Sequence, residues 1–132
     1  MTNKRILPIA VYGTLREGQR NDRLWTMLGG KSEPCLIPGF RLVAQTMNYF
    51  PFALPDEQES SVGEVITFDD DRDYFVALQR MDQLEGVPSF YRRVETDVMT
   101  ANGVIRAWIY TPSDPDEYSD FPRVPLNDWL CV

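Results

Sequence analysis

The stretch DDDRDYFVALQRMDQLEG, residues 69–86, decides the organisation of the chain because it encodes one well-defined helix between two strand-like segments. Three successive aspartates offer N-caps at its start, and Gly86 suits a left-handed stop at its end. Segments rich in β-branched residues flank it, namely Val62–Phe68 before it and Tyr91–Met99 after it. The pattern predicts a helix that runs to about Glu85 and packs against a sheet.

A β-hairpin is expected directly after this helix. The segments Tyr91–Met99 and Val104–Tyr110 alternate apolar and polar residues, and Asn102-Gly103 between them is typical of a type I′ turn. A two-residue turn at that place pairs Val98 with Ala107 across the hairpin, so that one face is mostly apolar.

The remaining segments are mostly strand-like. Ile6–Tyr12 is an apolar run that predicts a buried strand, Arg20–Leu28 could form a short helix capped by Asn21, and Asp56–Ser61 has the composition of a polar loop. Strands thus dominate around one solid helix. We expect a single α+β domain spanning residues 1–132, with a mixed or antiparallel sheet that could close into a barrel.

Composition excludes several classes of function. The 132 residues carry a net charge of −7 without a basic tract, which argues against binding to nucleic acid or to acidic membrane surfaces. No apolar run approaches the roughly 20 residues that span a bilayer, and no signal-peptide cleavage pattern follows the N-terminus. Two cysteines without metal spacing favour reduced thiols, so a cytoplasmic location is expected.

The sequence contains no histidine at all. This removes the Ser-His-Asp and Cys-His nucleophile systems and the commonest zinc sites. In particular, an acyl hydrolase that uses the Cys35 thiol lacks its histidine partner. Any acid–base chemistry must come from carboxylates, Tyr, Lys or a thiol.

Glu85 is the carboxylate that stands out. At 100° per residue, Tyr74, Leu78 and other apolar residues of the predicted helix share one face, and Glu85 falls within their arc. It also lies at the helix C-terminus, where the macrodipole disfavours a negative charge. Desolvation should raise its pKa towards neutrality, which suits a general base. The alternative is that the helix ends one residue earlier and Glu85 faces water.

Two other carboxylates compete for this role. Asp82 lies at the edge of the apolar arc, and we interpret it as a solvated flank residue. Glu64 shares its strand parity with Ile66 and Phe68, so it could point inward as well; we interpret it as a structural residue paired to an arginine.

A glycine turn and a tyrosine complete the set of candidate residues. Tyr12-Gly13-Thr14-Leu15 follows the first predicted strand, and its backbone N–H groups could cradle an anion; the alternative is a simple turn. Tyr91 could donate a hydrogen bond across a pocket, whereas Arg93 on the same face is better explained by ordinary packing.

Taken together, these segments resemble the gamma-glutamylcyclotransferase-like family. The matching stretches are VYGTLREGQRN (Val11–Asn21), FPFALPD (Phe50–Asp56), VGEVITF (Val62–Phe68), MDQLEGVPSFYRRVETDV (Met81–Val98) and WIYTP (Trp108–Pro112). The short YGTLR turn is similar to the branch that acts on gamma-glutamylamines.

The resemblance implies a small mixed β-barrel with flanking helices and no metal or organic cofactor. It implies that backbone groups of Tyr12, Gly13, Thr14 and Leu15 bind a gamma-glutamyl substrate, that Glu85 is the catalytic acid and base, and that Tyr91 contacts the substrate. The implied reaction releases 5-oxoproline and a free amine. The alternative is a non-catalytic ligand-binding or interaction domain on the same fold.

Overall fold

The computed structural model describes residues 6–45 and 50–131, and in these ranges the chain folds into a closed barrel with helices outside it. The elements are β1 (Ile9–Val11), α1 (Arg23–Thr26), β2 (Lys31–Val43), β3 (Phe52–Thr67), α2 (Asp71–Glu85), β4 (Tyr91–Thr100), β5 (Gly103–Pro112) and the 3-10 helices η1 (Pro115–Tyr118), η2 (Pro125–Asn127) and η3 (Trp129–Cys131). None of the helices in these ranges is long and apolar enough to cross a membrane.

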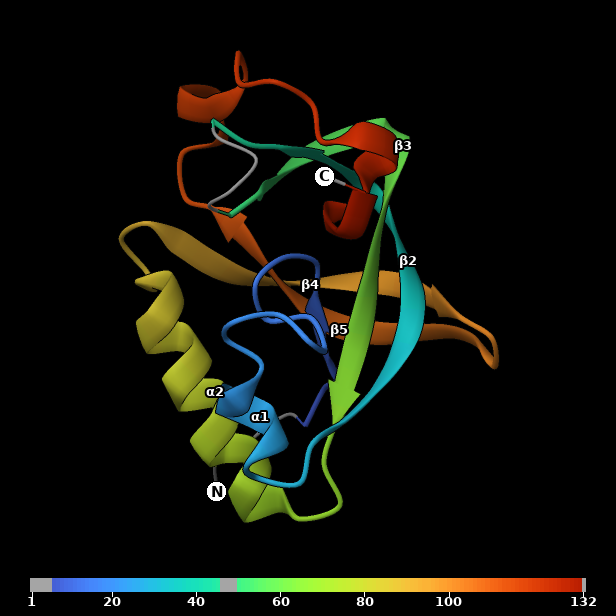
Figure 1. Ribbon diagram of the computed structural model, residues 1–132, viewed down its shortest axis with the longest axis vertical. Coiled ribbons are helices and arrows are strands. Elements are labelled where there is room, and N and C mark those ends of the chain that lie inside the picture. Colours follow the sequence, from blue (N-terminus) through green and yellow to red (C-terminus); the bar gives the residue numbers. More distant parts are fainter. Residues whose placement is uncertain (1–5, 46–49, 132) are drawn as a thin grey trace.

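The barrel has the strand order β1-β3-β2-β4-β5 and closes where β5 lies parallel to β1, with Ile9 opposite Trp108. The other neighbouring strands are antiparallel. The sheet is therefore mixed, and α2 runs along one side of the barrel (Figure 1). The predicted α+β fold, a small mixed β-barrel with flanking helices, is confirmed.

Helix α2 has the caps that its sequence encodes. The Asp70 carboxylate accepts hydrogen bonds from the amides of Arg72 (2.7 Å) and Asp73 (3.3 Å), which have no partner inside the helix. Gly86 ends the helix in the left-handed region, with φ 66°, where a residue without a Cβ is favoured. The helix ends at Glu85, so this residue is held by helical geometry.

The apolar residues form two clusters on either side of the barrel wall. The first fills the barrel interior and includes Ala10, Ile37, Leu42, Val65 and Ile109. The second joins the outer wall to the helices and includes Ile9, Trp25, Ile66, Tyr74, Leu78 and Met81. The apolar face of α2 is buried in the second cluster, as predicted, except that Leu84 is exposed at the pocket described below.

The hairpin register differs from the predicted one. Val98 pairs with Ile105 instead of Ala107, and Thr100 pairs with Gly103. The turn therefore centres on Ala101-Asn102, one residue earlier than expected, where the Thr100 hydroxyl donates to the Gly103 carbonyl and accepts from the Asn102 amide. Because the pairing moves by two residues, each side chain still faces the predicted side.

Three further predictions of secondary structure were wrong, one in the type of element and two in its length. Asp56–Ser61 is not a loop but part of the long strand β3; Ser60 and Ser61 pair with β2, and residues 56–59 lie where the register shifts between Pro38 and Phe40. The predicted strand at residues 6–12 is reduced to Ile9–Val11. The predicted helix at residues 20–28 is reduced to Arg23–Thr26, because the Asn21 side chain binds Thr14 instead of capping the helix.

The C-terminal segment folds back over the end of the β2–β3 pair (Figure 1). Ala44 and Val124 donate backbone hydrogen bonds to Pro122 and Leu42, and the Leu42 amide donates to the Asn127 side chain. Trp129 is buried in the barrel cluster. This return path brings Tyr118 and Asp128 next to elements from the first half of the chain.

Candidate active site

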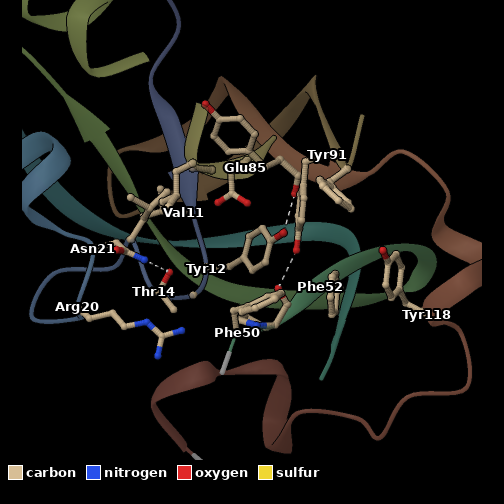
Figure 2. A pocket seen from close by; sticks show the side chains of 17 residues that line it. Val11, Tyr12, Thr14, Arg20, Asn21, Phe50, Phe52, Glu85, Tyr91 and Tyr118 are labelled. Carbon is tan, nitrogen blue, oxygen red and sulfur yellow. Dashed lines mark hydrogen bonds between the residues drawn. The ribbon is translucent and has the colours of Figure 1, made fainter. Parts of the chain in front are cut away.

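One pocket collects the residues that the resemblance assigned to catalysis and substrate binding. It has a volume of about 500 Å³, in the usual range for small-molecule sites, and lies between the turn after β1 and the C-terminal end of α2. Tyr12, Gly13, Thr14, Leu15, Glu85 and Tyr91 all line it. In Figure 2 the Glu85 carboxylate points into its centre, with the Tyr12 ring beside it.

The Glu85 carboxylate has no hydrogen-bond or ion-pair partner in the part of the chain that the structure describes. No other described residue donates a hydrogen bond to it or forms an ion pair with it. Burial raises its pKa from 4.5 to about 7, because few water molecules can reach a carboxylate in this position. A group with this pKa can both accept and donate a proton near neutral pH.

Two tyrosines lie next to Glu85 and are held from the protein side. The Tyr12 hydroxyl donates to the carbonyl of Tyr110 (2.7 Å) and the Tyr91 hydroxyl donates to the carbonyl of Pro51 (3.3 Å). Burial, together with the nearby Glu85 charge, raises the pKa of both hydroxyls well above the ordinary value. Both therefore remain neutral hydrogen-bonding groups at physiological pH.

The backbone carbonyl groups of Gly13, Thr14 and Leu15, in the turn after β1, accept hydrogen bonds from other parts of the protein. The Gly13 carbonyl accepts from the Arg16 amide, the Thr14 carbonyl accepts from the Asn21 amide, and Trp25 Nε1 donates to Leu15. Within the described residues, the amides of positions 13, 14 and 15 donate to no other group. Gly13, Thr14 and Leu15 line the pocket, and their amides have no acceptor among the described residues, an arrangement that suits an anionic ligand.

Gly13 is required here for steric reasons. A Cβ at this position would lie 2.6 Å from Cδ of Pro51, which is closer than real Cβ contacts. The glycine lets the turn approach the Pro51 segment across the pocket.

A buried ion cluster fixes the same turn from behind. Arg16 Nε donates to Glu64 (2.6 Å), Arg16 Nη1 donates to Asp128 (2.7 Å), and the other Glu64 oxygen accepts from the amide of Glu17 (2.7 Å). The interpretation of Glu64 as the structural partner of an arginine is confirmed. The role of Asp128 was missed, because no local pattern links the C-terminal segment to this turn.

The interpretation of Asp82 as a solvated residue was wrong. Its carboxylate accepts two hydrogen bonds from Arg93 (2.8 and 3.1 Å) and one from the Tyr110 hydroxyl (2.6 Å). Arg93 also lies 4.6 Å above the Trp108 ring, so its predicted packing role holds. This network ties the last turns of α2 to the hairpin and thereby supports Glu85.

Among the described residues, neither a reactive thiol nor a metal site accompanies this pocket. Cys35 belongs to the barrel cluster, and burial, followed by the nearby Glu64 charge, raises its pKa to about 12, so it is not a thiolate. Among residues 6–45 and 50–131, no group of three or more Cys, Asp or Glu side chains could hold a metal ion.

Sequence reasoning missed the aromatic side of the pocket. Phe50, Phe52, Phe90 and Tyr118 all line it, and in Figure 2 Phe52 and Tyr118 lie on the side away from Asn21 and Arg20. Phe50 and Phe52 belong to the stretch Phe50–Asp56, which was quoted for its resemblance to the family. Tyr118, by contrast, comes from a segment without regular periodicity.

The family model described as "Gamma-glutamyl cyclotransferase, AIG2-like" matches residues 9–131. A protein of Methanocaldococcus jannaschii, whose name assigns it provisionally to the gamma-glutamylcyclotransferases, is 32% identical over 109 residues, which are 77% of this chain and 81% of that protein.

Solved structures agree with this assignment at the level of the fold. The mouse AIG2-like protein superposes with a TM-score of 0.71 at 24% identity, covering 92% of this chain and 87% of that one. An uncharacterised Pyrococcus horikoshii protein superposes with a TM-score of 0.66 at 26% identity, covering 93% and 89%. The match therefore extends over nearly the whole chain, and this protein belongs to the AIG2-like gamma-glutamyl cyclotransferase family and is an enzyme of that type.

Proposed function

We propose that this enzyme converts a gamma-glutamyl amine or amide to 5-oxoproline and a free amine, with Glu85 as the group that moves the proton. The observation that carries this proposal is a carboxylate with a pKa of about 7 that points into a pocket and has no partner among the described residues, beside a turn whose amides have no described acceptor. A pocket that only binds a ligand has no need to bury an unpaired acid, which costs stability.

The turn supplies the binding site for the glutamyl half in this proposal. The amides of Gly13, Thr14 and Leu15 would hold its α-carboxylate, because free backbone donors in a turn stabilise an anion. The Tyr91 hydroxyl, buried and neutral, would contact the substrate from the other wall. These contacts would place the α-amine of the substrate near the Glu85 carboxylate.

The chemistry requires one proton to move and one C–N bond to be exchanged for another. Glu85 accepts a proton from the α-amino group, whose nitrogen then attacks the γ-carbonyl carbon of the same molecule. The attack closes a five-membered ring with a tetrahedral γ-carbon, and this intermediate collapses as the bond from the γ-carbon to the leaving nitrogen breaks, so that the ring remains as 5-oxoproline. The protonated Glu85 donates its proton to that leaving nitrogen and returns to a carboxylate.

The nucleophile belongs to the substrate, which explains how a chain without histidine can perform acyl transfer. Holding the amine near the carbonyl could contribute up to about 7–11 kcal/mol to lowering the barrier. Proton transfer by Glu85 would contribute a further ~10²–10⁴-fold in rate.

The test is release of 5-oxoproline from a panel of gamma-glutamyl compounds that includes amines, gamma-glutamyl-lysine and dipeptides. We expect the wild type to cleave at least one of them and Glu85→Gln to cleave none. Glu57→Gln is the matched control, because Glu57 is an exposed glutamate on β3. Tight binding of a gamma-glutamyl compound without any turnover would instead support the alternative, a non-catalytic binding domain.

A further inference from the structure

The position of Glu85 in the pocket depends on how the end of α2 is held, because its carboxylate has no partner among the described residues. Asp82 lies three residues earlier on α2, about one helical turn away. Its carboxylate accepts from Arg93 Nε and Nη2 at 2.8 and 3.1 Å and from the Tyr110 hydroxyl at 2.6 Å. Three hydrogen bonds from two strands thus converge on one side chain next to the helix end.

Asp82 also closes the end of the helix through its backbone. Its carbonyl accepts from the Val87 amide at 3.0 Å, across the left-handed residue Gly86. This bond is the one that ends a helix in a Schellman motif, and Glu85 lies inside the loop that it closes. The backbone of Glu85 is therefore held by the same residue whose side chain is fixed to the barrel.

The same anchor reaches the two tyrosines that lie next to Glu85. Arg93 follows Tyr91 by two residues on β4, so both side chains lie on one face, and Tyr110 is directly opposite Arg93 on β5. The Tyr110 carbonyl accepts from the Tyr12 hydroxyl at 2.7 Å. Glu85, Tyr91 and Tyr12 (Figure 2) are thus tied to one carboxylate, through a helical turn, a strand and a carbonyl.

The geometry of this anchor is well fixed. An arginine fork binds a carboxylate through two N–H bonds and sets its orientation as well as its distance. Arg93 is itself held against Trp108, with its Cζ atom 4.6 Å from the ring centroid. Because the Asp82–Arg93 pair is neutral as a whole, it holds the helix end without adding a net charge beside Glu85.

We propose that Asp82 is the positioning residue for the Glu85 carboxylate, and that its bonds to Arg93 and Tyr110 set the distance between this carboxylate and the reacting groups of the substrate. A misplacement of about 1 Å can cost up to ~10²-fold in rate. Asp82 is not among the described residues that line the pocket, so it acts through Glu85 and not by contact with the substrate. This inference rests on the proposed function, because it takes Glu85 as the group that moves the proton.

Steady-state kinetics of two variants test this role, with kcat expressed per folded molecule. Tyr110→Phe removes one hydroxyl and keeps the ring in the pocket, so kcat for 5-oxoproline release should fall about three- to tenfold. Asp82→Asn weakens the fork and should lower kcat about 10- to 100-fold. KM should stay within about twofold in both variants, because the turn that would bind the glutamyl half is unchanged.

An unchanged kcat in these variants, or a loss that appears only in KM, would overturn the inference. If Asp82→Asn does not fold, Tyr110→Phe decides, because it leaves the Asp82–Arg93 pair in place.

The Arg41–Asp56 ion pair provides a matched control. Its two side chains are 21% and 27% exposed, close to the 23% and 25% of Arg93 and Asp82, and neither is among the described lining residues. Asp56→Asn should therefore destabilise the fold without changing kcat. A fall in kcat as large as that of Asp82→Asn would show that the loss of any half-buried ion pair is enough, and would overturn the inference.

Arg93→Lys separates position from charge. Lysine keeps the positive charge beside Asp82 but cannot form the fork, so kcat should still fall about tenfold. The midpoint of an NMR titration of the Glu85 carboxyl carbon should also fall below about 7, since a displaced carboxylate meets more water.

This titration needs no turnover, so it separates the inference from the proposed function. Burial raises the pKa of the three hydroxyl groups that face Glu85 from β1, β4 and β5 and keeps them neutral; they belong to Tyr12, Tyr91 and Tyr110. Arg20 is the other charged side chain among the described lining residues. A lowered midpoint in Arg93→Lys together with an inactive wild type would retain the anchor and reject the reaction. An active wild type, with both kcat and midpoint unchanged in Arg93→Lys, would retain the reaction and overturn the anchor.

Discussion

Glu64, which is buried, and Glu85, which lines the pocket, are two glutamates with opposite surroundings. Glu64 accepts from Arg16 and from the Glu17 amide and lies in an ion cluster with Asp128. Glu85 accepts from no described residue and faces a pocket. The first arrangement stabilises a charge and holds a turn in place, while the second leaves a carboxylate able to exchange a proton. The difference shows that the partners of an acid, more than its burial, separate a structural role from a chemical one.

Glu85→Gln is expected to have the largest effect of any exchange at these two sites. Gln cannot accept and return the proton, so kcat should fall by about 10²–10⁴-fold or below detection. The fold should be kept, which circular dichroism would check. Retention of full activity would place the base elsewhere.

Glu64→Gln should give the reverse pattern. Among the described residues it leaves the buried Arg16 charge with Asp128 as its one ionic partner, so the free energy of unfolding should fall by about 3 kcal/mol. Turnover of the folded fraction should mostly persist, since Glu64 is not a pocket residue. Urea denaturation together with the 5-oxoproline assay measures both quantities, and complete loss of turnover in folded protein would move the base to Glu64.

The free energy of unfolding should also depend on pH because Glu85 ionises at a different pH in the folded and unfolded states. Its folded-state pKa is raised, so the folded protein keeps a proton that the unfolded chain releases between pH 4.5 and about 7. The carboxylate therefore lowers stability as pH rises through this window, by at most about 3 kcal/mol.

Glu85→Gln removes this pH-dependent loss of stability. The variant should be more stable than the wild type at pH 8 and equal to it at pH 4, whereas Glu57→Gln should match the wild type at both. A difference between Glu85→Gln and the wild type that does not change with pH would argue against a raised pKa.

Asp128→Asn should have the smallest effect of the series. Its side chain is 22% exposed and the Arg16–Glu64 pair stays intact, so we expect a loss of about 1 kcal/mol in the free energy of unfolding. Because Arg16 follows the pocket turn, KM for the gamma-glutamyl substrate should rise modestly. An unchanged KM would show that the C-terminal segment does not position the turn.

Sequence reasoning succeeded where the signals were local. The Asp70 cap, the Gly86 stop and the apolar face of α2 lie within one stretch, and together they placed Glu85 at the helix end. The hairpin was found but its turn was misplaced, because the Thr100 hydroxyl bonds stabilise a turn one residue earlier than Asn102-Gly103 suggests.

The larger failures concern contacts between segments that are distant in the sequence. Residues 56–61 have the composition of a loop, yet Glu59 is paired with Arg123 and accepts from Asn127, and Asp56 lies 3.4 Å from Arg41. The position of Asp82 in the helix is typical of a surface residue, but its carboxylate binds Arg93 and Tyr110 in the folded protein. Likewise, Tyr118 reaches the pocket only because the C-terminal segment returns across the barrel.

The central claim is that Glu85, which has no partner among the described residues, has a pKa near neutrality. An NMR titration of its side-chain carboxyl carbon measures this pKa directly. Protein labelled with ¹³C at the glutamate δ-carbons would be titrated from pH 3 to 9, and Glu85→Gln would identify the resonance. The account predicts a midpoint of about 7 for Glu85. A midpoint near 4.5, the ordinary value for glutamate, would contradict it.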